Sequence, residues 1–249
     1  MNFMLIWPIA VLVTAGIILM ILERILPARS LPHVPGWWIR VILINIMQAG
    51  VMVLGGLTWE QYLQSLSLVN VPWPNEVFAV ATTYFAITFV FYWWHKWRHD
   101  VEWLWTTCHQ IHHSPSRIET ITSFYKHPLE IFLNSIIIAT IVYPVMGLSL
   151  QAGAWVTVCT GLAEFLYHMN IKTPYWWGFV FQRPESHRVH HERNKHYKNF
   201  ADLPLWDMIF GTFENPHREV TCGFRLEREL MFYKMLTFKN VNQKRDLDE

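Results

Sequence analysis

Long apolar stretches are the feature that most limits how this chain can fold. Five of them approach the roughly 20 residues that a helix needs to cross the hydrocarbon core of a bilayer. They cover residues 3–22, 38–57, 77–94, 131–150 and 152–168. Only 16% of the 249 residues are charged, against about 25% in an average soluble domain. The sequence therefore predicts an all-α integral membrane protein with four to five transmembrane or re-entrant helices.

The first and the last two apolar stretches each carry a further indication. No Lys or Arg precedes residue 3, so the first stretch is interpreted as a retained helix and not as a cleaved signal peptide. The last two stretches are joined by almost no connection, with Pro144 and Gly147 near the join. We expect them to form a tight hairpin that does not fully cross the membrane.

The distribution of Lys and Arg predicts the orientation. The 58–76 connection has no basic residue, whereas 24–40, 96–126 and the chain after 171 contain all of them. By the positive-inside rule these basic regions are cytoplasmic and the N-terminus is outside. A bacterial cytoplasmic membrane is favoured, or the endoplasmic reticulum in a eukaryote. Seven tryptophans near the predicted membrane ends are interpreted as an interfacial aromatic belt: Trp37, Trp38, Trp93, Trp94, Trp97, Trp176 and Trp177.

The chain is interpreted as a single domain, 1–249, in two parts. Residues 1–168 are mainly membrane helices, and residues 169–249 are a cytoplasmic cap of short helices broken by prolines. The net charge of +1 gives no indication of a nucleic-acid partner. Three widely separated cysteines without CxxC spacing indicate neither a disulfide framework nor a zinc knuckle, and favour a reducing compartment.

Thirteen histidines are the outlier in this composition, and eight of them are regularly spaced. They occur in HKWRH (95–99), HQIHH (109–113) and HRVHH (187–191). Spacings of three and four place imidazoles on one face of a helix, where neutral nitrogens can bind a metal. Eight ligands exceed the coordination of one metal and suit two. The candidates are His95, His99, His109, His112, His113, His187, His190 and His191.

The type of metal stays open on these residues alone, since imidazole suits zinc, iron, copper and nickel. The chain has no HExxH, which disfavours a zinc metalloprotease, and no ExxH, which disfavours a soluble four-helix diiron carboxylate site. His33, His196 and His217 have no spaced partners and are interpreted as packed or surface residues.

The three histidine motifs, in this order around these apolar stretches, resemble those of the fatty acid hydroxylase and sterol desaturase superfamily. Further segments agree with bacterial members of that family: ERILPA (23–28), YKHPLE (125–130), YHMNIKTP (167–174) and NFADLPLWDMIFGTFENP (199–216). The resemblance implies a membrane-bound, non-haem diiron enzyme that uses O2 and two electrons. It implies two iron ions as cofactor, with zinc as a substitute in purified samples.

The resemblance also carries His168 into the ligand set, because the family places a ligand histidine in this segment. Some members have HxxxH here, whereas this chain has EFLYH (164–168). Glu164 is therefore expected to be a ligand or to hydrogen-bond a ligand imidazole. His127 is expected to support the site or the fold in preference to binding metal.

The implied function is O2-dependent hydroxylation of an unactivated C–H bond in a membrane lipid, such as a fatty acyl chain or a sterol. The alternative is a desaturase with the same metal site; a histidine-rich metal transporter is disfavoured, because the midplane stretches lack histidine. Without a flavin, haem or dinucleotide motif, electrons are expected from a separate donor of ferredoxin or cytochrome b5 type with its reductase. Five basic cap residues are candidates for docking that donor: Arg183, Arg188, Arg193, Lys195 and Lys198.

Overall fold

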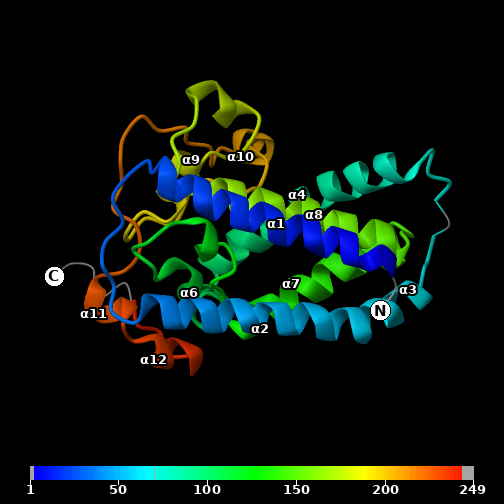
Figure 1. The fold of residues 1–249 in the computed structure, drawn as a ribbon, viewed down its shortest axis with the longest axis horizontal. Coiled ribbons are helices and arrows are strands. Elements are labelled where there is room, and N and C mark those ends of the chain that lie inside the picture. Colours follow the sequence, from blue (N-terminus) through cyan, green and yellow to red (C-terminus); the bar gives the residue numbers. More distant parts are fainter. Residues whose placement is uncertain (1–2, 70, 243–249) are drawn as a thin grey trace.

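A computed structural model describes residues 3–69 and 71–242. Long helices lie side by side along the length of the molecule (Figure 1). They are α1 (Phe3–Ile25), α2 (Trp37–Leu57), α4 (Glu76–Asp100), α7 (Pro128–Thr140) with its π-helical continuation η3 (Ile141–Val145), and α8 (Leu150–His168). In the described residues the β contact is one isolated bridge, between Glu192 and Cys222. The prediction of an all-α protein is confirmed.

Short helices make up most of the rest of the fold. They are α3 (Trp59–Ser65), α5 (Glu102–Leu104), η1 (Trp105–His109), α6 (Gln110–His113), η2 (Thr120–Thr122), η4 (Tyr175–Phe179), α9 (Pro184–His190), α10 (Pro204–Phe210), α11 (Leu226–Glu229) and α12 (Phe232–Leu236). The elements after α8 gather at one end of the long helices, together with α6 (Figure 1, left). This end is called the cap.

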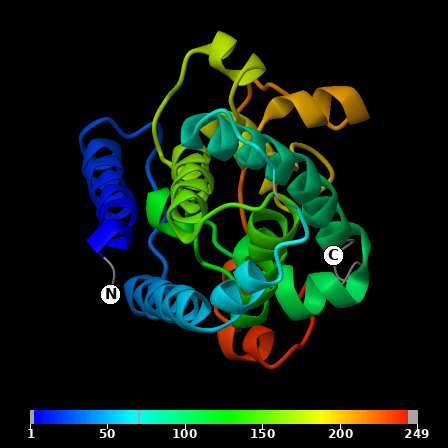
Figure 2. The same cartoon turned by 90° about the vertical axis from the view of Figure 1, so that its right-hand side faces the viewer.

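Four of the five predicted stretches are long and apolar enough to span a membrane. They are Trp7–Ile25, Trp37–Ser65, Glu76–Asp100 and Pro128–Val145. The fifth, in α8, does not reach that hydropathy, although α8 packs along both α1 and α4. Figure 2 shows the bundle end on, with α8 inside the ring of the other long helices. A position among helices, with less lipid contact, accounts for the lower apolarity of α8.

Two buried carboxylates join the first helix to the segment around η2, to α2 and to the chain after α8. Glu23 is fully buried, and its Oε2 accepts hydrogen bonds of 2.9 Å from the backbone N–H groups of Thr120 and Asn170. Glu119 accepts from Trp37 Nε1 at 3.0 Å and pairs with Arg24. Since Trp37 is buried in this network, its assignment to an interfacial belt is wrong, whereas Trp38, Trp97 and Trp176 are about half exposed or more.

Close contact between α1 and α8 depends on glycine. A Cβ built on Gly161 would lie 2.7 Å from Leu12 Cδ1, and one built on Gly16 would lie 3.0 Å from the ring of Phe165. Small residues let helices approach closely in a bilayer, where packing takes the place of hydrophobic association. The α1–α8 contact in turn holds the end of α8, and with it His168, at the cap.

Replacing Gly161 by leucine should force α1 away from α8. Overpacking of this kind costs about 1–3 kcal/mol, so we expect a lower thermal unfolding midpoint in detergent micelles. Gly50 in α2 is the matched control, because no atom lies within 4 Å of a Cβ built there. Equal midpoints for Gly161→Leu and Gly50→Leu would show that the α1–α8 contact is not tight.

Candidate metal centre

Nine buried or half-buried histidines gather in two clusters where the long helices meet the cap, and within each cluster the ligand atoms lie within 4.8 Å of one another. The first histidine group contains His95, His99, His109, His113 and His190. The second histidine group contains His112, His168, His187 and His191. These are the nine ligands expected from the sequence, and the structure brings all of them together.

Each HxxHH motif divides its histidines between the two groups. In HQIHH, His109 and His113 lie in the first group, whereas His112 lies in the second. In HRVHH, His190 lies in the first group, and His187 and His191 lie in the second. The residues from His109 to His113 are not one regular α-helix as expected, because His109 ends the π-helical turn η1 before α6 begins. Both HxxHH motifs therefore contribute histidines to both groups.

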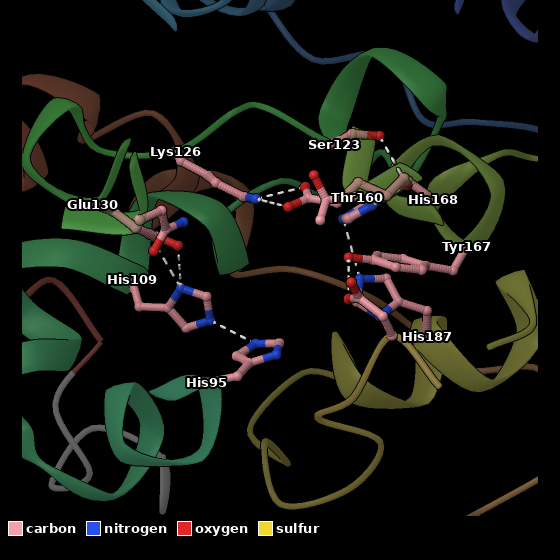
Figure 3. A network of polar contacts seen from close by, with 12 residues as sticks. His95, His109, Ser123, Lys126, Glu130, Thr160, Tyr167, His168 and His187 are labelled. Carbon is pink, nitrogen blue, oxygen red and sulfur yellow. Dashed lines mark hydrogen bonds and ion pairs between the residues drawn. The ribbon is translucent and has the colours of Figure 1, made fainter. Parts of the chain in front are cut away.

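Hydrogen bonds fix the orientation of several rings. Nδ1 of His95, His168 and His190 donates to the backbone carbonyls of Phe200, Glu164 and Lys198 at 2.7–2.8 Å. The carboxylate of Glu130 accepts from His109 Nδ1 at 3.1 Å (Figure 3). A proton on Nδ1 leaves the lone pair of a neutral imidazole on Nε2. These four rings thus present Nε2 to the interior of the site.

The Nε2 atoms converge at distances suited to a shared ion. His109 Nε2 lies 3.0 Å from His95 Nε2 and 3.1 Å from His113 Nε2. In the second group, His187 Nε2 lies 3.1 Å from the Nε2 atoms of both His168 and His191. Imidazole nitrogens bound to one metal ion at about 2.1 Å sit about 3 Å apart. Bare lone pairs at this separation repel unless a cation lies between them.

The donor set fits a pair of transition metal ions. Nε2 of His190 and both ring nitrogens of His99 are buried without a hydrogen-bond partner, which is costly for a polar atom unless something binds it. Imidazole ligands suit iron, and outer hydrogen bonds to carbonyls and carboxylates are typical of metal-binding histidines. Both groups therefore fit the implied irons.

Burial keeps the imidazoles in the form that binds metal. Desolvation lowers the pKa of His112, His113, His187 and His191 well below the ordinary value, and neighbouring histidines lower it further. The pKa of His190 falls to about 3, mainly through desolvation. Neutral imidazole has a free lone pair at physiological pH.

A segment beyond the histidine motifs ties the second and third motifs together. Gly223 N donates to His191 O at 3.1 Å, and Phe224 N donates to Ser114 O at 3.0 Å. Arg193, two residues after the third motif, donates to the carbonyls of Gly223 and Phe224 at 3.0 Å. Because Ser114 directly follows His113, these bonds set the separation of the two HxxHH motifs.

Glu164 and His127 lie outside both groups. The Glu164 carboxylate pairs with Lys126 Nζ at 2.5–2.6 Å and does not contact a ligand ring. Glu164 instead contacts His168 through its backbone carbonyl, which accepts a hydrogen bond from His168 Nδ1. His127 caps α7, with Nδ1 accepting from Leu129 N at 3.0 Å. The carboxylate that does hydrogen-bond a candidate ligand is Glu130, which the sequence analysis missed within the YKHPLE segment.

The structure also changes the interpretation of His196 and of three arginines. The His196 ring lies 4.8 Å from that of His113, beside the first histidine group, so it is not remote from the site as expected. Arg183 and Arg188 are at most 8% exposed, and Arg193 bonds the 223–224 carbonyls. Their assignment to a docking surface is wrong, because Arg183 and Arg188 are buried and the Arg193 guanidinium donates to internal carbonyls.

Comparison with known proteins gives a consistent result. The sequence model of the family described as "Fatty acid hydroxylase" matches residues 80–212, more than half of the chain. Human alkylglycerol monooxygenase is 31% identical over 66% of this chain and 36% of its own length. Ornithine lipid hydroxylase OlsE of Rhizobium tropici is 29% identical, over 59% of this chain and 46% of its own.

A relative from Arabidopsis thaliana, named for a Delta(7)-sterol-C5(6)-desaturase, is 28% identical over 65% of this chain and 56% of its own length. The chain thus spans about a third to about half of the curated relatives that it matches. No solved structure matches it significantly.

Replacing Gly223 by alanine should separate the two HxxHH motifs and release metal. A Cβ at Gly223 would lie 2.2 Å from the backbone oxygen of Pro115, and φ is +72°. Gly211 is the matched control: its φ is +76°, but no atom lies within 4 Å of its Cβ position. In both variants the alanine must adopt a left-handed backbone conformation, which destabilises the folded state by about 1–2 kcal/mol. Bound metal per folded protein should fall in Gly223→Ala alone; equal metal content would refute the role of this segment.

The metal-free protein should lose stability as the pH falls. The buried histidines bind fewer protons in the folded state than in the unfolded state, where their pKa is about 6.5. Their contribution is therefore complete above that pH and declines below it, by up to about 1.4 kcal/mol per pH unit for each histidine. Thermal unfolding of the chelator-treated protein between about pH 7.5 and 5.5 measures this. A midpoint that stays constant or rises with acid would contradict neutral burial.

Proposed function

Because this chain belongs to the fatty acid hydroxylase family, we propose that it is a membrane-bound, metal-dependent oxidoreductase that hydroxylates a lipid with O2. The observation that carries the proposal is the pair of histidine groups at the end of the long apolar helices. Such a site needs its lipid substrate delivered from the bilayer, and α4 and α8 run from the apolar bundle into it.

The nine histidines have the role of metal ligands in this proposal. His95, His99, His109, His113 and His190 would hold one ion, and His112, His168, His187 and His191 the other. Two bound irons supply the activation of O2 that oxidation of an unactivated C–H bond requires. One oxygen atom enters the lipid as a hydroxyl group, and the other leaves as water, with two electrons from a donor and two protons.

The chain itself contributes orientation and the exclusion of water. Carbonyls of Phe200, Glu164 and Lys198 fix three ligand rings, and Phe200 packs 5.4–5.8 Å from the His95, His99 and His190 rings. A dry cavity of fixed shape directs the oxidant to one carbon and protects it from side reactions. The face of the membrane on which the cap lies is cytoplasmic in this proposal, as the basic residues predict.

Electrons would come from a separate donor of ferredoxin or cytochrome b5 type. Of the five candidate cap residues, Lys195 and Lys198 remain for docking, because Arg183 and Arg188 are buried and Arg193 donates to internal carbonyls. The Lys195 side chain is 53% exposed and already lies 3.2 Å from Glu192. A docking surface on these two lysines alone is small.

Desaturation by the same site is the second candidate, supported by the desaturase name of the Arabidopsis relative. The two outcomes differ in the product and not in the ligands. Hydroxylation adds one oxygen to the lipid, whereas desaturation removes two hydrogens, so the product mass distinguishes them.

Replacing His112 or His190 by alanine tests the metal centre, because each lies in a different group. Each variant should lose at least the iron of its own group, and product should fall by about a thousandfold or more, the loss expected when machinery that acts as a unit is broken. Iron is measured by mass spectrometry of the purified protein. Product is measured in lipid extracts supplied with oxygen-18.

His217→Ala is the control for these variants. His217 is an exposed histidine that stacks on Tyr175 with ring centroids 4.2 Å apart, outside both groups. It should retain iron and product. Full turnover in His112→Ala or His190→Ala would refute the proposed centre.

A further inference from the structure

A pocket lies where the connection between α1 and α2 meets the cap (Figure 1, left). Its volume is about 330 Å³, at the lower end of the range of about 300–1,000 Å³ that is usual for small-molecule sites. Its lining comes from within residues 29–34, from Ser116 and Arg193, and from within residues 220–229. Among the described residues that line it, none belongs to either histidine group. A ligand bound here would therefore be separate from the metal centre.

Three charged side chains line this pocket: Arg29, Arg193 and Glu229. Within the described part of the chain, none of the three takes part in a salt bridge. Two guanidinium groups against one carboxylate leave an excess of one positive charge. Charges removed from water need an opposite charge or strong hydrogen bonds, so this lining favours a ligand that carries a negative group.

The hydrogen bonds of Arg29 do not neutralise its charge. Nη1 donates to the Val220 carbonyl at 2.9 Å, and Nη2 donates to the Cys222 thiol at 3.3 Å. A thiol sulfur is a weak acceptor. Nε of Arg29 is buried and has no hydrogen-bond partner among the described residues. Because a guanidinium matches the oxygens of a phosphate or a carboxylate, Arg29 suits an anionic group in the pocket.

Glu229 lacks a hydrogen-bond donor on the other side of the pocket. It is 2% exposed, and its Oε2 accepts from Ser116 N at 3.2 Å. Its Oε1 is buried without a partner among the described residues. Desolvation raises the pKa of this carboxyl, although the hydrogen bonds from Ser116 oppose the shift. A ligand that fits must therefore carry both an anion for Arg29 and a donor for Glu229.

The pocket lies beside two helix ends that are apolar and exposed. Ile25 and Leu26 precede it at the end of α1, and Trp38 and Ile39 follow it at the start of α2. All four are about half exposed or more. Both helices are long and apolar enough to span a membrane, so the connection between them lies at the level of lipid head groups. Basic pockets at this level bind lipid phosphates, and phosphate is therefore the anion favoured here.

We propose that this pocket binds a phosphoethanolamine group, with its phosphate on Arg29 and its ammonium on Glu229. The phosphate supplies the missing negative charge, and the ammonium supplies N–H donors to the buried carboxylate. Phosphatidylethanolamine and free phosphoethanolamine both carry this group. A phosphocholine group has the same charges but no N–H, and inorganic phosphate has no ammonium, so both should bind more weakly. The inference does not depend on the oxidation proposed above.

Native mass spectrometry of the full-length protein in detergent tests the lipid. Phosphatidylethanolamine and phosphatidylcholine with the same acyl chains are added in equal amounts. Phosphatidylethanolamine should be retained about tenfold more, because it alone offers donors to a buried carboxylate.

Calorimetric titration with phosphoethanolamine, phosphocholine and inorganic phosphate tests the free compounds. Preference for phosphatidylethanolamine in the lipid experiment alone would identify the lipid as the ligand. Phosphoethanolamine that binds about tenfold more tightly than the other two, with no preference between the lipids, would identify the free compound. Either result supports the inference, and no preference in either experiment overturns it.

Glu229→Gln tests the ammonium site, because it removes the charge and keeps the shape of the side chain. The preference for the ethanolamine over the choline compound should fall to about one. Glu227→Gln is the matched control, since Glu227 is exposed on the same helix, α11, and does not line the pocket. It should keep the preference. A preference that survives Glu229→Gln, or one that Glu227→Gln also abolishes, would overturn the assignment.

Arg29→Met tests the phosphate site independently. It should weaken binding of the ethanolamine and choline compounds alike, by about tenfold, with unchanged iron content as the measure of an intact fold. Arg225→Met is the matched control, because Arg225 is exposed and does not line the pocket. Binding that is unchanged in Arg29→Met, or equally weak in Arg225→Met, would overturn the inference.

Discussion

Nine imidazoles can share so small a volume only while they remain neutral and while each lone pair has a defined direction. Burial provides the first condition, because it makes protonation of His112, His187 and their neighbours unfavourable. Hydrogen bonds from Nδ1 to fixed carbonyls provide the second. When both conditions are met, the Nε2 atoms can converge to about 3 Å from one another.

Those carbonyl acceptors come from parts of the chain with little else in common. Phe200 belongs to the connection before α10, which Asp207 holds by accepting from the backbone N–H groups of Phe200 and Ala201 at 2.8 and 3.0 Å. Glu164 belongs to a long helix of the bundle, and Lys198 to a loop in the cap. Packing of α8 against α1 through Gly161 therefore bears on the orientation of His168. The geometry of the histidine groups therefore depends on packing in the apolar bundle as well as on contacts in the cap.

Much of the candidate site could be predicted from spacing. The spacing of the three motifs identified eight of the nine histidines that the structure gathers in the two groups, and the resemblance to the family added His168 in the YHMNIKTP segment. Spacing could not predict that His112 belongs to a different group from His109 and His113. That division depends on a π-helical turn and on where α8 and α9 lie. Nor could spacing identify Glu130, whose partner His109 is 21 residues away. Basic residues were misjudged for the same reason: the exposure of Arg183 or Arg188 is a property of packing.

The sequence alone determined the all-α membrane architecture, the identity of the histidines and the family, because hydropathy, helical period and motif order are all local or linear properties. Tertiary structure decided the pairing of each histidine with its group, the link through Gly223 and the pocket lined by Arg29 and Glu229. These depend on contacts between segments distant in sequence, whose distances are set only when the helices pack.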